Sequence, residues 1–154
     1  MKREFLALQA LGEQLIGLTA EQLQSIGLEE RLLDAVIAAK SMRAHGALRR
    51  QKQLIGKLMR GVDPEPIRAA LDAFGQNARM EKTIFRQAEK WRDRITSGDD
   101  DDLAAFSEFL GYKNVALMNE VGSFRSACDE KSRRHARRRI FREIHKELAH
   151  KMQS

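Results

Sequence analysis

The residues best suited to chemistry in this sequence are cations that recur at helical spacing. The stretch RRQKQLIGKLMR, residues 49–60, holds five lysines and arginines and no acid. At about 100° per residue along a helix, most of these cations fall opposite an apolar stripe, which consists of Leu48, Leu54, Ile55, Leu58 and Met59. The stretch therefore predicts a helix with one face for the core and a cationic face for an anionic partner.

A second cationic segment lies near the end of the chain. Residues 131–151 hold nine lysines and arginines against two glutamates, and residues 40–60 hold seven against no acid. Each segment carries a net charge of +7 in a chain whose total is +6, so the remainder is acidic. A solvated helix face usually mixes charges, because like charges repel and opposite charges at i, i+4 stabilise a helix. Faces of one sign favour polyanion binding. The predicted contact residues are Arg43, Arg49, Arg50, Lys52, Lys57, Arg60, Arg133, Arg134, Arg137, Arg138, Arg139, Arg142 and Lys146.

Two glycines, Gly46 and Gly56, also fall on the cationic face of the first segment. A glycine inside a helix costs about 1 kcal/mol relative to alanine, so both need a reason. Close approach of a sugar–phosphate backbone is one explanation. Contact between two helices, or simple tolerance, is the other.

The elements that position these cations are all predicted to be helices. The chain has only two prolines, and strand-like alternation of β-branched residues is missing from it. Thr19 with Gln22 predicts a capping box, and Asp63 before Pro64 predicts a helix start. Helices are expected over residues 2–17, 20–26, 29–60, 64–97, 101–110, 113–129 and 132–152.

The predicted helix over residues 64–97 has an apolar stripe that changes direction midway. The stripe that begins at Ile67 and the stripe that begins at Ile84 differ in direction by about 100°. One core would need one stripe. We therefore expect two helical domains, residues 1–80 and 81–154, that share this helix. Trp91 belongs to the second stripe, which favours core packing over stacking on a base.

Signatures of catalysis are missing from the sequence. It contains no G-x-S-x-G motif, no Walker A loop and no dinucleotide fingerprint, so we expect no enzyme and no cofactor. His145 and His150 are five residues apart, which excludes an H-E-x-x-H zinc site. Helix capping explains Asp99–Asp102 more simply than a metal does. With one cysteine, no signal peptide and no apolar run of 18 residues, we expect a cytoplasmic protein outside the membrane.

Three motifs closely resemble the proteobacterial DarP family, also called YjgA. They are RRQKQLIGKLMR (49–60), DPEPIRAALD (63–72) and EKWRDRI (89–95). The opening segments KREFLALQALGEQL and LTAEQL are similar as well, so the resemblance covers residues 2–102, and the last third matches more loosely. The resemblance implies an elongated, all-α dumbbell: two three-helix bundles that share a long central helix.

The same resemblance implies a ribosome-associated protein that assists maturation of the large ribosomal subunit. Together with the cationic faces, it predicts a monomeric, non-catalytic factor of ribosome biogenesis. This factor would bind 23S-type rRNA in the large-subunit precursor and promote its late maturation. The alternative, from another class of function, is a helical scaffold that binds an acidic protein. A peripheral membrane protein that binds through residues 133–152 is a third possibility.

Overall fold

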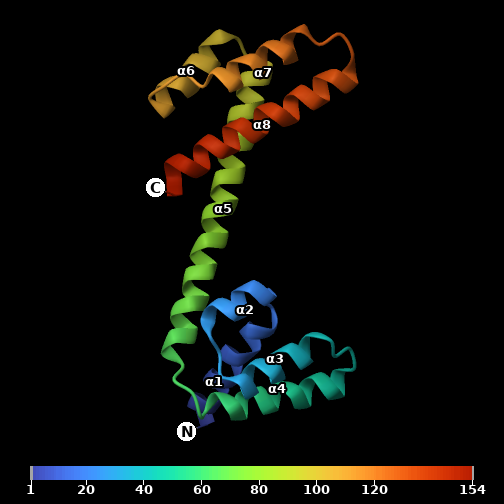
Figure 1. Ribbon diagram of the computed structural model, residues 1–154, viewed down its shortest axis with the longest axis vertical. Coiled ribbons are helices and arrows are strands. Elements are labelled where there is room, and N and C mark those ends of the chain that lie inside the picture. The colour runs from blue at the N-terminus through green and yellow to red at the C-terminus, as the bar shows by residue number, and fades with distance from the viewer. Residues whose placement is uncertain (1, 154) are drawn as a thin grey trace. The chain divides into compact units, whose positions relative to one another are not determined.

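The computed structural model describes residues 2–153, and these residues form eight α-helices with no strand among them (Figure 1). In chain order the helices are α1 (Lys2–Ile16), α2 (Ala20–Ile26), α3 (Glu30–Lys40), α4 (His45–Met59), α5 (Glu65–Ser97), α6 (Asp100–Leu110), α7 (Val115–Ser126) and α8 (Glu130–Gln153). The predicted all-α class is therefore confirmed. Within the same residues, no helix is both long and apolar enough to cross a membrane.

The chain divides into two compact units, Met1–Gly75 and Gln76–Ser154, and α5 contributes residues to both. Ile67 of α5 is buried in the core of the first unit, and Ile84 is buried in the core of the second. The change in direction of the apolar stripe thus accompanies a change of core. The division after residue 80 and the elongated dumbbell of two three-helix bundles stay predictions.

The core of the N-terminal unit is built mainly from α1, α3 and α4. Helix α1 packs against both α3 and α4, and α3 and α4 lie side by side (Figure 1). Because the apolar residues recur every three or four positions, each helix turns one stripe inward. The buried members of this core are Leu11, Leu15, Leu23, Leu32, Ala35, Val36, Ala39, Ile55, Met59 and Ile67.

The predicted helix over residues 29–60 is wrong at its centre, because residues 41–44 separate α3 from α4. Ser41 closes the end of α3. Its backbone N–H and its hydroxyl both donate to the carbonyl of Ala38, at 3.3 and 3.1 Å. The break lets α4 fold back along α3 so that both helices contact α1. Burial of two stripes in one core outweighs the helical hydrogen bonds lost at the break, since packing supplies most helical stability.

Helices α1 and α4 approach each other closely at two buried glycines. A Cβ atom at Gly12 would lie 2.6 Å from Cγ2 of Ile55, and one at Gly56 would lie 3.0 Å from Cβ of Gln9. Of the two explanations for Gly56, the structure therefore supports contact between helices. Gly46 lies in the first turn of α4. Apart from its chain neighbours and the backbone of its own helix, no described atom lies within 4 Å of a Cβ added there.

The core of the C-terminal unit forms between the second part of α5 and helices α6, α7 and α8. Helix α7 packs along α8 (Figure 1). Trp91 packs against this core with its ring 5.0 Å from that of Phe106, so the prediction of core packing for Trp91 is confirmed. The buried members are Ile84, Ala88, Ile95, Phe106, Leu117, Val121, Ile140, Ile144 and Leu148.

Several helices begin at the capping residues that the sequence predicts. The backbone N–H of Gln22 donates to the hydroxyl of Thr19 at 3.1 Å, and the reciprocal bond of the capping box measures 3.0 Å. Asp63 accepts a backbone hydrogen bond at the start of α5, and Asp99 accepts one in the first turn of α6. Among residues 2–153, no three His, Cys, Asp or Glu side chains gather closely enough to hold a metal ion.

Candidate nucleic-acid interface

Four predicted contact residues of the first cationic segment surround one groove in the N-terminal unit. The groove lies between α1 and α4 and has a volume of about 570 Å³. We call it the α4 groove, and its lining residues are Phe5, Leu6, Gln9, Glu13, Arg49, Lys52, Gln53, Lys57 and Arg60. Two other predicted contacts, Arg50 on α4 and Arg43 in the preceding turn, are exposed but do not line it.

The cations of the α4 groove keep their charge for a ligand. Within the described part of the chain, Arg49, Lys52 and Lys57 form no ion pair. The guanidinium of Arg60 lies over the ring of Phe5, with 4.1 Å between Cζ and the ring centroid. A ring orients a guanidinium without neutralising it. The groove therefore sets four cations against one acid, Glu13.

One cation of the first segment supports the fold. The ammonium of Lys40 donates to the carbonyl of Ile16 at 2.8 Å and also to the carbonyl of Leu18. Ile16 is the last residue of α1 and Leu18 lies just beyond it, so neither carbonyl has a partner within the helix. Lys40 thus joins the end of α3 to the end of α1, and its charge already satisfies protein acceptors.

The buried face of α4 is narrower than the predicted stripe, which also includes Leu54. Ile55 and Met59 are fully buried, whereas Leu54 is 41% exposed and Leu58 is half-buried. The prediction that Leu54 belongs to the core is therefore wrong. Helices α1 and α3 cover α4 from two directions, and their position decides which arc of α4 is buried.

The second cationic segment surrounds a groove in the C-terminal unit, between α5 and α8. This groove has a volume of about 550 Å³, and no acidic residue lines it. We call it the α8 groove, and its lining residues are Phe85, Arg92, Arg134, Arg137, Arg138, Phe141 and Arg142. Four of these seven are predicted contact residues.

Two arginines of the α8 groove share one carboxylate. Asp93 on α5 accepts from Arg92 at 3.1 Å and from Arg137 at 2.7 Å. In residues 2–153, Arg134, Arg138 and Arg142 have no ion pair, so their guanidinium groups need not break an internal contact to bind an anion.

The remaining predicted contacts on α8 lie outside the groove. Arg139 donates to Glu120 of α7 at 2.6 Å, so an internal acid already balances its charge. The guanidinium of Arg133 lies 5.9 Å from the ring centroid of Phe124. Lys146 is exposed. The structure thus brings together Arg134, Arg137, Arg138 and Arg142, and it separates Arg133, Arg139 and Lys146 from them.

Helix α8, which carries these arginines, is capped at its start by Asp129. The backbone N–H of Ser132 donates to the Asp129 carboxylate at 2.6 Å. Hydrogen bonds from Ser132, above all this backbone bond, lower the pKa of Asp129 below its ordinary value, because they favour the charged form. The anionic cap also suits the positive end of the helix dipole.

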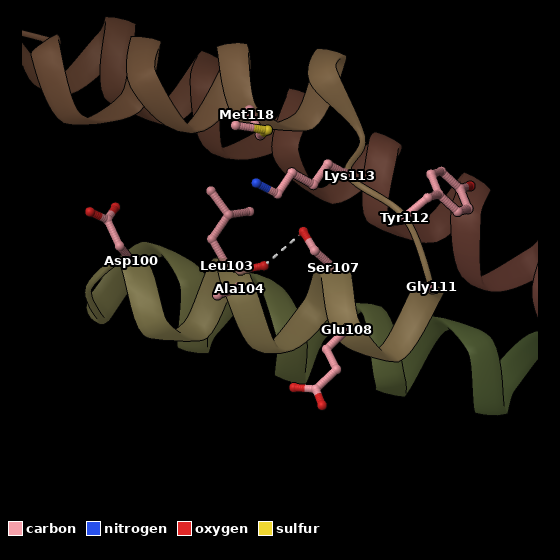
Figure 2. Close-up of a pocket in the computed structure, with 9 residues that line it drawn as sticks. All are labelled: Asp100, Leu103, Ala104, Ser107, Glu108, Gly111, Tyr112, Lys113 and Met118. Atoms are coloured by element: carbon pink, nitrogen blue, oxygen red, sulfur yellow. Dashed lines mark hydrogen bonds between the residues drawn. The ribbon is translucent and has the colours of Figure 1, made fainter.

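A third pocket lies between α6 and α7 (Figure 2). Its volume is about 720 Å³. In Figure 2, Leu103 rises from α6 towards α7, Lys113 extends into the gap between the two helices and Glu108 points away from it. The hydroxyl of Ser107 donates to the carbonyl of Leu103 within α6, at 3.1 Å. With Asp100 and Glu108 against one lysine, this pocket does not share the cationic character of the α4 and α8 grooves.

Sequence reasoning missed the aromatic members of both grooves, which are Phe5, Phe85 and Phe141. Phe85 directly follows Ile84 and therefore lies off the stripe that the core residues Ile84, Ala88 and Trp91 define along α5. A large apolar side chain beside a buried stripe was the available signal. Its position against α8 depends on tertiary packing.

A family model described as "Dual-action ribosomal maturation protein DarP" matches residues 1–149. The chain belongs to the DarP family. The match extends beyond the predicted range of residues 2–102 and includes both cationic grooves.

Several proteins that carry the DarP name are similar along most of the chain. The one from Thiobacillus denitrificans is 41% identical over 153 residues, which cover 99% of this chain and 85% of that protein. The one from Nitrosospira multiformis is 45% identical over 132 residues, or 84% of this chain and 71% of that protein. The DarP protein of Chromobacterium violaceum is 39% identical over 146 residues, with 93% and 79% covered. The family resemblance predicted from the motifs is therefore confirmed.

Proposed function

We propose that the chain is a non-catalytic ribosomal maturation factor that binds rRNA of the large-subunit precursor. Its DarP relatives are named ribosomal maturation proteins, and the family match spans both grooves. The observation that carries the proposal is the presence, in each unit, of a groove with at least three cations that have no acidic partner among the described residues.

The chemistry of both grooves suits a phosphate backbone. An arginine guanidinium has a planar fork of donors that fits phosphate oxygens, and a lysine adds a compact charge. A-form RNA is recognised mainly by its shape and by contacts to phosphates and 2′-hydroxyls. A cation with no internal ion pair binds phosphate without first losing a protein contact. The candidate contacts are Arg43, Arg49, Arg50, Lys52, Lys57, Arg60, Arg133, Arg134, Arg137, Arg138, Arg139, Arg142 and Lys146.

The proposed mechanism is a shift in the folding equilibrium of 23S-type rRNA. Each unit offers one cationic groove, so a single monomer can hold two RNA segments. A ligand favours the conformation that it binds more tightly. Binding to a late arrangement of the precursor would raise the population of that arrangement, and maturation would proceed without a covalent step.

Two other functions compete with RNA binding. A scaffold for an acidic protein would use the same cations, and the name of the DarP relatives favours the ribosome over it. Attachment to a membrane through α8 would need the apolar residues of this helix at the surface. Ile140, Ile144 and Leu148 are instead buried in the C-terminal core, so α8 could insert them only after the unit opened.

Co-sedimentation with isolated large subunits and their precursors tests the proposal. We expect the chain to sediment with them at low salt and to leave as salt rises. Neutralising about six phosphates implies roughly a thousandfold loss of affinity between about 50 and 200 mM salt. Anionic vesicles at the same salt serve as the control for membrane binding. A flat salt dependence, or equal binding to vesicles, would contradict the proposal.

A further inference from the structure

The α8 groove contains an exposed aromatic ring that phosphate binding does not require. Phe85 on α5 is 48% exposed, although a buried phenylalanine would contribute apolar burial to stability. A single exposed apolar residue is ordinary on a protein surface. The unusual feature is its setting, because the other lining residues of this groove are five arginines and one more phenylalanine.

Contacts within the groove hold the exposed ring in place. The rings of Phe85 and Phe141 meet edge to face, with centroids 5.1 Å apart and planes inclined by 65°. Phe141 is half-buried and packs against the core of the C-terminal unit. The guanidinium of Arg92 lies 5.4 Å from the ring centroid of Phe141. Phe85 thus rests on a supported aromatic neighbour while almost half of its surface stays open to a ligand.

The charges around Phe85 favour an anion that also has an apolar, planar part. Asp93 holds Arg92 and Arg137 through ion pairs of 3.1 and 2.7 Å. The other three arginines of the groove have no acidic partner within residues 2–153. A nucleotide combines a phosphate with a flat base, and bases stack on aromatic rings with little dependence on sequence.

We propose that the α8 groove binds an unpaired nucleotide of the RNA, with its base stacked on Phe85 and its phosphates held by Arg134, Arg138 and Arg142. The inference rests on the proposed function and adds the class of RNA that this groove takes. Bases in a duplex are stacked on each other and cannot reach a side chain, whereas bases in loops and bulges can stack on aromatic residues. The α4 groove differs, because Arg60 already covers the ring of Phe5. We therefore assign only phosphate contacts to the α4 groove.

Binding of the full chain to two RNA hairpins tests this assignment. In both hairpins a flexible linker without bases replaces the loop nucleotides. One stem is fully paired, and the other is identical except for one unpaired uridine. Fluorescence anisotropy should show tighter binding to the bulged hairpin. Phe85→Leu should weaken that binding by about five- to 150-fold, the range for loss of one stacked base, and should leave the paired hairpin unaffected. Phe85→Trp should restore the preference, which separates stacking from a loss of folding.

Two further measurements separate stacking from charge. The slope of affinity against salt should stay unchanged in Phe85→Leu and should fall when Arg134, Arg138 and Arg142 are changed to Gln, because only phosphate contacts release counterions. Ultraviolet crosslinking of the bulged uridine should map to the peptide that contains Phe85.

The possible failures are distinguishable. One outcome is that the unsubstituted chain binds both hairpins with a steep salt dependence, that Phe85→Leu binds each hairpin with the affinity of the unsubstituted chain, and that the crosslink maps elsewhere. In that case this inference is wrong and the proposed function stands. If the unsubstituted chain binds neither these hairpins nor large subunits, the proposed function is wrong, and the inference that rests on it is overturned as well.

Discussion

The guanidinium of Arg60 lies 4.1 Å from the ring centroid of Phe5, so the residue that follows α4 rests on the first turn of α1. The contact closes one end of the α4 groove and holds the guanidinium beside the other groove cations. Because the ring leaves the charge intact, Arg60 stabilises the packing of α1 on α4 and still offers a cation to a ligand.

A double-mutant cycle with Phe5→Leu and Arg60→Gln should measure this contact. Leucine keeps the apolar bulk at position 5 and removes the aromatic face, and glutamine removes the cation. We expect a coupling free energy of about 0.5–1 kcal/mol from urea unfolding, the usual range for a cation–π pair at an exposed site. Additive effects of the two substitutions would show that the contact does not stabilise the fold.

Two neighbouring residues of α4 should respond very differently to truncation. Ile55 is fully buried against α1, so Ile55→Ala should lower the free energy of unfolding by about 2–5 kcal/mol. Leu54 is 41% exposed, and Leu54→Ala should cost less than about 1 kcal/mol. Urea unfolding of both variants gives the comparison. Equal losses would mean that Leu54 belongs to the core, as the apolar stripe predicts.

That contrast shows how far periodicity predicts this fold. Spacing of apolar residues predicted helices and the change of stripe in α5, because both depend on residues within one helix. The exposure of Leu54 at the edge of the stripe in α4 depends on where α1 and α3 lie, and no local pattern contains that information. The break after Ser41 has the same origin, since residues 41–44 include no proline or glycine.

The candidate site was predictable to a similar degree. Runs of arginine and lysine predicted which helix faces are cationic, because charge is read directly from residue type. Internal partners were not predictable, since Arg137 and Asp93 are 44 positions apart and Arg139 and Glu120 are 19 apart. These pairs decide which cations remain for a ligand. The place of Phe85 beside α8 arises in the same way, from tertiary packing.

The cap at Asp129 should make the stability of α8 depend on pH. The folded state lowers the pKa of this carboxyl below its ordinary value of 3.8, so its contribution is present above that value and is lost as pH falls through the lowered pKa. Asp129→Ala should therefore lower the melting temperature at pH 7. The difference from the parent should shrink as pH falls below about 4. A difference that is constant from pH 7 to pH 2 would contradict an anionic cap.

The central test uses two triple variants, each of which removes three positive charges. They differ in where the charges lie, so the second is the control for the first. The first changes the α4-groove residues Arg49, Lys52 and Lys57 to Gln. Glutamine is nearly as good a helix former as arginine or lysine, and none of these side chains belongs to the buried core, so melting should barely change. The second changes Arg68, Arg94 and Arg125 to Gln, each of which lies within 3.1 Å of an acidic partner and is not among the candidate contacts.

The association constant with large-subunit precursors, measured against salt for the parent and both triple variants, tests the central claim most directly. Each lost phosphate contact should reduce the slope of the logarithmic plot by about one. We expect the first variant to bind more weakly with a slope reduced by about three, and the second to keep the slope of the parent. Equal losses in the two variants would show that overall charge, and not the α4 groove, drives association. Unchanged binding of the first variant would show that this groove does not contact the RNA.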